Sequence, residues 1–170
     1  MNWHKDLIII KDNFFEETLF KKIQAELDTS KFKSTKPDET YKQIYFKAPI
    51  VKDHPAALVI KSFFKAEFGI IITAMESFYL LSPKHEKPSP HSDRIKINCP
   101  IYLKGGSLMN NGTALYEKDG ENWVINSHIG FKENRAVMFS SERTHASLQF
   151  AEGATGRFIM GNFIEDYELE

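Results

Sequence analysis

The sequence contains very little that could crosslink the chain or carry it into a membrane. Its 170 residues include one cysteine, Cys99, so no intramolecular disulfide can form and a reducing compartment is expected. The first apolar run, Leu7–Ile10, is too short for the core of a signal peptide, and no run approaches the length of a membrane span. We therefore expect a cytoplasmic protein without a membrane partner.

The chain also lacks an excess of either charge. Lysine and arginine number 22 against 23 acidic residues, and no basic tract is present, which argues against a nucleic-acid partner. The apolar fraction is 42%, with 14 phenylalanines, which is typical of a globular protein with a real core. A single domain over residues 1–170 is expected, as a monomer or a weak homodimer.

Two helices are predicted in the first half of the chain. Asn13 and Glu16 have the spacing of a capping box, and the apolar residues that follow recur every three or four positions. The second helix is expected to begin at Asp53-His54-Pro55, with proline in its first turn, and to end at Gly69. Both helices have an apolar side that could cover a sheet.

After Gly69 the pattern predicts strands, and the tail 164–170 is expected to be loose. The order of elements predicts a mainly β (α+β) fold, a double-stranded β-helix or jelly roll with the helices packed on one sheet. The expected strands are Ile70–Leu81, Arg94–Lys104, Thr113–Tyr116, Trp123–Ile125, Arg135–Phe139, Thr144–Phe150 and Thr155–Phe163.

A possible metal site begins at His91-Ser92-Asp93. With the distant His145, these residues supply two imidazoles and one carboxylate, the ligand set of non-haem Fe(II) oxygenases. His91 and Asp93 share the parity of the apolar positions 95–101, so they are predicted on the inward face of one strand, with Asn98 outward. Two alternatives stay open: a surface turn without a metal, and a zinc site doing hydrolysis.

Arg157 is the predicted partner of this site. If Ala151–Gly153 forms a three-residue hairpin loop, Ser147 pairs with Arg157, and Arg157 lies on the face of His145. An arginine inside a barrel needs an anion, and its guanidinium could grip a carboxylate. The alternatives are a solvent-exposed His145 and a surface ion pair for Arg157.

The chain resembles the prolyl-4-hydroxylase-like branch of the 2-oxoglutarate- and Fe(II)-dependent dioxygenases over nearly its whole length. This branch includes small stand-alone proteins of bacteria and phages. The similar segments are Ile8–Phe15 with the helix after it, Pro90–Asp93, Pro100–Leu103, Gly112–Tyr116 and Asn134–Ser140 leading to His145.

The resemblance implies that His91, Asp93 and His145 hold Fe(II), and that Arg157 binds the far carboxylate of 2-oxoglutarate together with Ser147. It also implies a cosubstrate contact from a tyrosine on the strand before the motif, for which Tyr79 is the candidate. O2 would be the second cosubstrate, and succinate and CO2 the co-products.

The expected substrate is a peptide, as in prolyl hydroxylation, or a small molecule. Tyr41, Tyr45 and Phe46 are expected either to form a lid over the substrate or to be part of a strand packed on a helix. The alternative function is a non-catalytic jelly-roll module, for binding or as a phage-associated structural protein, which would have a pocket too closed or too open for a dicarboxylate.

Overall fold

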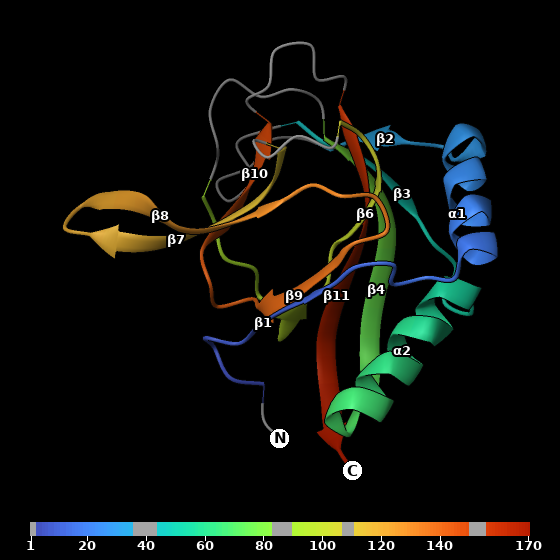
Figure 1. The fold of residues 1–170 in the computed structure, drawn as a ribbon, viewed down its shortest axis with the longest axis horizontal. Helices are drawn as coiled ribbons and strands as arrows, with labels where there is room; N and C mark the ends of the chain where they lie inside the picture. Colours follow the sequence, from blue (N-terminus) through green and yellow to red (C-terminus); the bar gives the residue numbers. More distant parts are fainter. Residues whose placement is uncertain (1–2, 36–43, 83–89, 107–110, 150–155) are drawn as a thin grey trace.

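The computed structural model describes residues 3–35, 44–82, 90–106, 111–149 and 156–170. In these residues two antiparallel β-sheets form the body of the molecule, and two helices lie together on one side of the larger sheet (Figure 1). The prediction of a mainly β jelly roll with N-terminal helices packed on one sheet is confirmed. No helix in the described ranges is long and apolar enough to cross a membrane.

The larger sheet has eight strands, and its centre is the long antiparallel pair β4 and β11. β6 (Ile101–Lys104) pairs with both β11 and β9 and lies off the main order. That order is β1 (Ile8–Lys11), β9 (Ala136–Ser140), β5 (Ile97–Asn98), β11 (Arg157–Leu169), β4 (Ile70–Ser82), β3 (Phe46–Pro49) and β2 (Lys33–Ser34).

The smaller sheet has three strands in the order β10 (His145–Gln149), β7 (Asn111–Asp119) and β8 (Asn122–Gly130). β7 and β8 form a ribbon that projects from the body (Figure 1), and Trp123, Val124 and Ile125 on it are exposed. The three strands predicted between residues 113 and 139 are present, and the first two are longer than expected.

Helix α1 (Glu17–Thr29) buries Phe20, Ile23 and Leu27 at the predicted spacing. The predicted capping box is wrong. Glu16 is the N-cap and makes no side-chain cap bond, while Asn13 has a φ of 51° in a turn before the helix. Asparagine tolerates this left-handed conformation, so Asn13 bends the chain between the end of β1 at Lys11 and the start of the helix.

Helix α2 (Pro55–Phe68) begins and ends where the sequence predicts. The Nδ1 atom of His54, its N-cap, accepts a hydrogen bond from the Ala56 amide at 3.2 Å. At the other end Gly69 has a φ of 63°, and its amide donates to the Lys65 carbonyl at 3.0 Å. Glycine adopts this left-handed conformation without a steric penalty, which ends the helix.

The larger sheet is buried on both faces at β5, at β9 and at Ile101–Leu103 of β6. Its helix side carries Ile97, Cys99, Ile101 and Leu103, which pack with the helices in one large core. The opposite side carries Tyr102, which packs with residues of both sheets in a second apolar cluster. The predicted alternation of residues 97–103 is therefore present, but its apolar side faces the helices rather than the interior of the jelly roll.

Two predicted segments differ from the structure. Arg94–Lys104 is not one strand, because the chain bends at residues 94–96 and the ladder is interrupted at Cys99-Pro100, where proline cannot donate a hydrogen bond. The tail is not loose, because β11 continues to Leu169 and pairs with Ile70–Met75 of β4. Ile164 in this segment is fully buried, so the tail contributes to the core.

Asn134 joins the segment before α1 to the larger sheet. Its side chain accepts from the Phe15 amide at 2.9 Å and donates to the Phe15 carbonyl at 2.8 Å, and all these groups are buried. Its own amide donates to the Tyr102 carbonyl at 2.8 Å, although its φ is 60°. One asparagine thus satisfies two backbone groups that have no strand partner.

We expect Asn134→Ala to lower the free energy of unfolding by about 2–4 kcal/mol, because two buried backbone groups lose their partners. Chemical denaturation measures this change. Asn134→Gly is the matched control for backbone conformation, since glycine accepts a positive φ but cannot bond to Phe15. A glycine variant as stable as the wild type would show that the side-chain bonds contribute little.

Candidate metal centre and buried arginine

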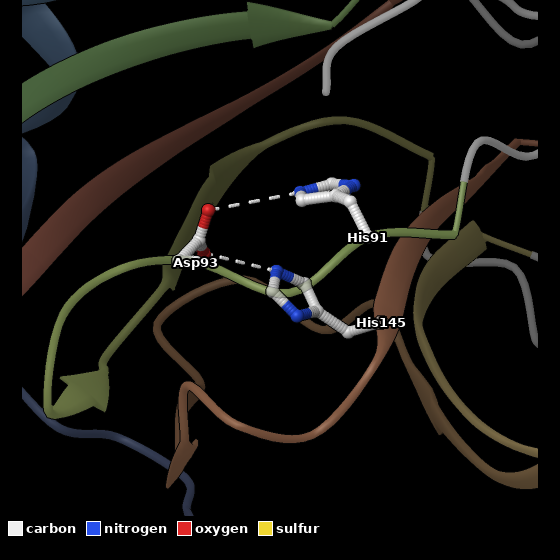
Figure 2. A group of neighbouring side chains, drawn as sticks. All are labelled: His91, Asp93 and His145. Carbon is white, nitrogen blue, oxygen red and sulfur yellow. Dashed lines mark ion pairs between the residues drawn. The ribbon is translucent and has the colours of Figure 1, made fainter. Parts of the chain in front are cut away.

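Three side chains form a group that could hold a metal ion. Candidate ligand atoms of His91, Asp93 and His145 all lie within 4.8 Å of one another. Asp93 Oδ1 is 3.9 Å from His91 Nε2, and Asp93 Oδ2 is 3.3 Å from His145 Nε2. Figure 2 shows both imidazoles directed at the one carboxylate. The structure therefore brings together the three residues that the sequence singled out.

The backbone fixes the relative position of the two histidines. The His91 amide donates to the His145 carbonyl at 3.0 Å, and the His145 amide donates to the His91 carbonyl at 2.8 Å. This isolated antiparallel bridge places residues from distant parts of the chain directly opposite each other. Asp93 is held by its own amide, which donates to the Ser141 carbonyl at 3.2 Å.

The tautomer of His145 follows from its surroundings. Its Nδ1 lies 3.0 Å from the Arg143 carbonyl, which can only accept, so Nδ1 carries the proton. Nε2 then directs its lone pair at the Asp93 carboxylate. Two acceptors face each other favourably only when a proton or a cation lies between them. The donor set thus fits a divalent metal, with the Nδ1 bond orienting the ring.

A cavity of about 280 Å³ between the two sheets contains this group. Its lining comes from β10 and β7 on one side and from β3, β4 and β11 on the other. Apolar residues make up much of the wall, among them Phe78, Leu80, Phe139 and Ile159. Phe139 packs edge-on against the His145 ring, with 4.9 Å between ring centroids. The cavity is partly closed by packing, so polar groups inside it are poorly solvated.

Arg157 lines another part of this cavity, and it is fully buried. Its Nη1 donates to the Gly112 carbonyl and its Nη2 to the Ser147 hydroxyl, while Nε has no hydrogen-bond partner in the part of the chain that the structure describes. Among the described residues no acidic side chain forms an ion pair with Arg157. Burial lowers the pKa of the guanidinium, and Tyr102 and Tyr45 oppose that shift.

A buried guanidinium without a carboxylate partner is costly, because its charge loses the solvation that water gives. Arginine stays charged even so, since its ordinary pKa is far above neutral. Counting the described residues alone, Arg157 therefore places at the cavity a positive charge that no ion pair balances. An anion in the cavity would supply the missing partner.

Gly112, whose carbonyl accepts a hydrogen bond from Arg157, is packed closely against the backbone of β8. A Cβ atom at this position would lie 2.0 Å from the Ile129 carbonyl oxygen on the neighbouring strand β8. Only glycine fits such an approach of two backbones. This contact explains why glycine stands at the start of the Gly112–Tyr116 segment. Thr113, the next residue, lines the cavity.

The predicted hairpin between His145 and Arg157 is wrong. Ser147 pairs with Thr113 of β7, and Arg157 pairs with Ser82 of β4 in the other sheet. The predicted loop Ala151–Gly153 lies outside the described residues. Arg157 and Ser147 still meet, but across the cavity between the two sheets and not along one hairpin.

Tyr79 does not reach the cavity, which corrects the prediction of a cosubstrate contact. Its side chain packs on the helix side of β4, and its hydroxyl donates to Glu26 of α1 at 2.6 Å. Nε2 of His54 lies 3.1 Å from the same Glu26 oxygen, so Tyr79 belongs to a polar link between the sheet and the helices.

Tyr45 is the tyrosine that lines the cavity, because it lies on the other side of the sheet. Burial raises the pKa of its hydroxyl, while the Arg157 charge and a hydrogen bond with Ser147 act against that shift. Phe46 lies in the adjoining strand β3, and Tyr41 falls outside the described residues. The sequence predicts Tyr45 either in a lid over the substrate or in a strand packed on a helix, and not as a cosubstrate contact. The signal that distinguishes the two tyrosines is the alternation of side chains. Tyr79 pairs with Ala48 and shares its helix-facing side, whereas Tyr45, three residues before Ala48, falls on the opposite side.

Asn98 was predicted to point outward, and this too is wrong. It is 3% exposed, lines the cavity and donates from Nδ2 to Asp93 Oδ2 at 2.9 Å. The error has a clear cause: the sheet buries both faces, so the polar side of β5 points into the jelly roll. The bend at residues 94–96 also interrupts the alternation of strand faces. His91 and Asp93 therefore do not continue the face of Ile97, as the sequence predicts.

Comparison with protein-family models and with curated protein sequences gives no match. Solved structures do match over nearly the whole chain. A prolyl-4-hydroxylase from Pseudomonas putida has a TM-score of 0.61 at 14% identity, covering 93% of this chain and 91% of its own. A Trichoplax adhaerens prolyl hydroxylase, in complex with a hypoxia-inducible factor peptide, has 0.59 at 16% identity, covering 94% and 83%.

A third similar structure is the epimerase SnoN in complex with Fe3+, alpha-ketoglutarate and nogalamycin RO. Its TM-score is 0.61 at 8% identity, and the match covers 99% of this chain and 83% of SnoN. The chain thus has the fold of the 2-oxoglutarate- and Fe(II)-dependent oxygenases. At these identities the likeness concerns the fold, and the chemistry has to be argued from the residues.

We expect Ni2+ to stabilise the protein against thermal unfolding, by about 2.7 kcal/mol at a free concentration 100 times its Kd. His145→Ala and Asp93→Ala should each remove most of this effect, since each loses one of three ligands. Differential scanning calorimetry with and without Ni2+ measures it. His128→Ala, which removes an exposed histidine on β8, is the matched control and should keep the full shift. Equal shifts in all four proteins would exclude this metal site.

Proposed function

We propose that this protein is an Fe(II)- and 2-oxoglutarate-dependent dioxygenase. One observation carries the proposal: a single cavity contains a group of two imidazoles and one carboxylate together with a buried arginine that has no acidic partner among the described residues. The first feature suits a divalent metal, and the second suits the far carboxylate of a dicarboxylate. SnoN, which has a similar fold, was crystallised with Fe3+ and alpha-ketoglutarate together.

His91, Asp93 and His145 would hold the metal. Two nitrogens and one carboxylate oxygen are the ligand set that non-haem Fe(II) oxygenases use, and three protein ligands leave coordination positions open. When bound, iron supplies the oxygen activation that protein side chains cannot perform. The protein's part is to hold the ligands: the bridge between His91 and His145 fixes their spacing, and the Arg143 carbonyl beside Nδ1 orients the His145 ring so that Nε2 faces Asp93.

Arg157 would bind the carboxylate of 2-oxoglutarate that lies away from the metal. Its unpartnered Nε and its orientation by the Gly112 carbonyl and the Ser147 hydroxyl leave donors for an anion. Tyr45, beside Ser147, is a further donor on the same wall. We therefore propose for Tyr45 the cosubstrate contact that the resemblance implies for Tyr79.

The substrate is proposed to be a peptide, such as a prolyl segment, or a small molecule that is hydroxylated with release of succinate and CO2. Similar structures hold both kinds of partner, a peptide in the Trichoplax enzyme and nogalamycin RO in SnoN. The cavity measures about 280 Å³ and must also hold the cosubstrate, which favours a small reacting group on the substrate. A non-catalytic module would need neither the ligand group nor the unbalanced arginine.

The single, fully buried Cys99 supports the proposal of a reducing, cytoplasmic compartment. Burial raises the pKa of its thiol, so the unreactive thiol form persists at neutral pH. A monomer or a weak homodimer remains the proposed state.

The test is the binding and turnover of 2-oxoglutarate. We expect the Mn2+-loaded protein to bind 2-oxoglutarate in calorimetry, and the Fe2+-loaded protein to convert it slowly to succinate in air. Arg157→Leu should weaken 2-oxoglutarate binding by at least about 30-fold, or about 2 kcal/mol, because a charged hydrogen-bonded pair is lost. Arg157→Lys should lie between the two, since lysine keeps the charge without the planar fork.

Arg94→Leu is the matched control, because Arg94 is exposed and the cavity lining does not include it. This variant should bind 2-oxoglutarate like the wild type. A protein that neither binds 2-oxoglutarate with Mn2+ nor forms succinate with Fe2+ would contradict the proposed function. Equal affinities for the wild type and Arg157→Leu would contradict the role of Arg157.

A further inference from the structure

We infer that Asn98 is a positioning residue for Asp93, holding its carboxylate in the one rotation that keeps it between the two histidines. The inference rests on the proposed function, since it concerns a ligand of the proposed metal. It assigns a role to a residue that lies outside the His91-Ser92-Asp93 motif. The basis is one hydrogen bond, together with the backbone that supports each of its ends.

The hydrogen bond joins Asn98 Nδ2 to Asp93 Oδ2 at 2.9 Å. An ionised carboxylate can only accept, so the amide must turn its NH2 group toward Asp93. Both side chains are removed from water, with Asn98 3% exposed and the Asp93 side chain 4% exposed. A charge-assisted hydrogen bond in such surroundings is strong, because burial reduces the competition from water for both partners.

The two residues differ in how firmly their backbones are held. Asn98 lies in β5 between two strands of the larger sheet, opposite Phe163 of β11 and Phe139 of β9. Asp93 lies outside the strands, directly before the bend at residues 94–96. Its amide bond to the Ser141 carbonyl positions the main chain, and the bond from Asn98 Nδ2 acts on the carboxylate itself. Because the backbone of Asn98 is held by two neighbouring strands, its hydrogen bond fixes the position of the Asp93 carboxylate relative to the larger sheet.

The orientation of the carboxylate matters because its two oxygens face different histidines. Oδ1 lies 3.9 Å from His91 Nε2 and Oδ2 lies 3.3 Å from His145 Nε2, as the dashed lines in Figure 2 show. Rotation of the carboxylate would move both oxygens out of this arrangement. Partners that orient a metal ligand typically change metal affinity by about 10–100-fold when they are removed.

The experiment is a titration with Co2+, followed by calorimetry and by the visible absorption of the bound ion. Asn98→Leu has a similar size and no donor, so we expect its Co2+ affinity to fall about 10–100-fold. We also expect its Co2+ spectrum to change, because the ligand field depends on how Asp93 is oriented. Asn98→Thr keeps a hydroxyl donor, and its affinity should lie between those of the wild type and Asn98→Leu.

Ser77→Ala is the matched control. It removes another buried hydrogen bond beside the cavity, from Ser77 Oγ to Asn162 Oδ1 at 2.8 Å, without touching the three proposed ligands. Its Co2+ affinity and spectrum should equal those of the wild type. If it loses as much affinity as Asn98→Leu, the effect is a general loosening of the sheet and the inference is overturned.

His145→Ala separates the inference from the proposed function. If it abolishes Co2+ binding while Asn98→Leu binds within twofold of the wild type and with the same spectrum, the role of Asn98 is overturned and the metal site stands. If Co2+ binding survives in His145→Ala, or the wild type binds none, both are overturned. Should Asn98→Leu not fold, Asn98→Ala takes its place: a lowered Co2+ affinity with a changed spectrum would support the inference, and wild-type affinity with a wild-type spectrum would overturn it.

Discussion

Burial of the larger sheet on both faces is the constraint on which the site depends. The helices cover one face with an apolar core, and the smaller sheet covers the other. Each strand must therefore send alternate residues into two different interiors, one dry and apolar and the other able to hold polar groups. In β4 this sorting places Tyr79 among the helices and Phe78 and Leu80 at the cavity. The site is the polar part of the second interior.

The site needs both sheets, because neither contains all of its parts. His145 and Ser147 belong to the smaller sheet, whereas Arg157 and Asn98 belong to the larger one. The bridge between His91 and His145 joins the His91-Ser92-Asp93 segment to the edge of the smaller sheet. The hydrogen bond from Asn98 joins Asp93 to the larger sheet. The geometry of the ligand group thus depends on how the two sheets are packed, which explains why long stretches of chain separate its members.

The sequence sufficed to predict what depends on local pattern and on residue chemistry. It placed α2 through Pro55 and Gly69, and it grouped His91, Asp93 and His145 because their donor atoms suit one ion. It failed where the answer depends on tertiary packing. A polar residue on a strand is assigned to solvent, so Asn98 is missed. Tyr79, the candidate that the resemblance implies, lies among the helices, because nothing local tells which covered face of β4 holds the cavity. The pairing of Ser147 with Arg157 was derived from a short loop, but the two strands belong to different sheets.

The buried guanidinium of Arg157 has a consequence for the evolution and engineering of this protein. A charge kept from water without an acidic partner lowers stability, and replacing buried charges with apolar side chains is often neutral or stabilising. Selection for heat resistance alone would therefore tend to remove this arginine. The presence of Arg157 therefore indicates selection for a function and not for stability. A library screened only for melting temperature would be enriched in more stable variants that no longer bind the anion.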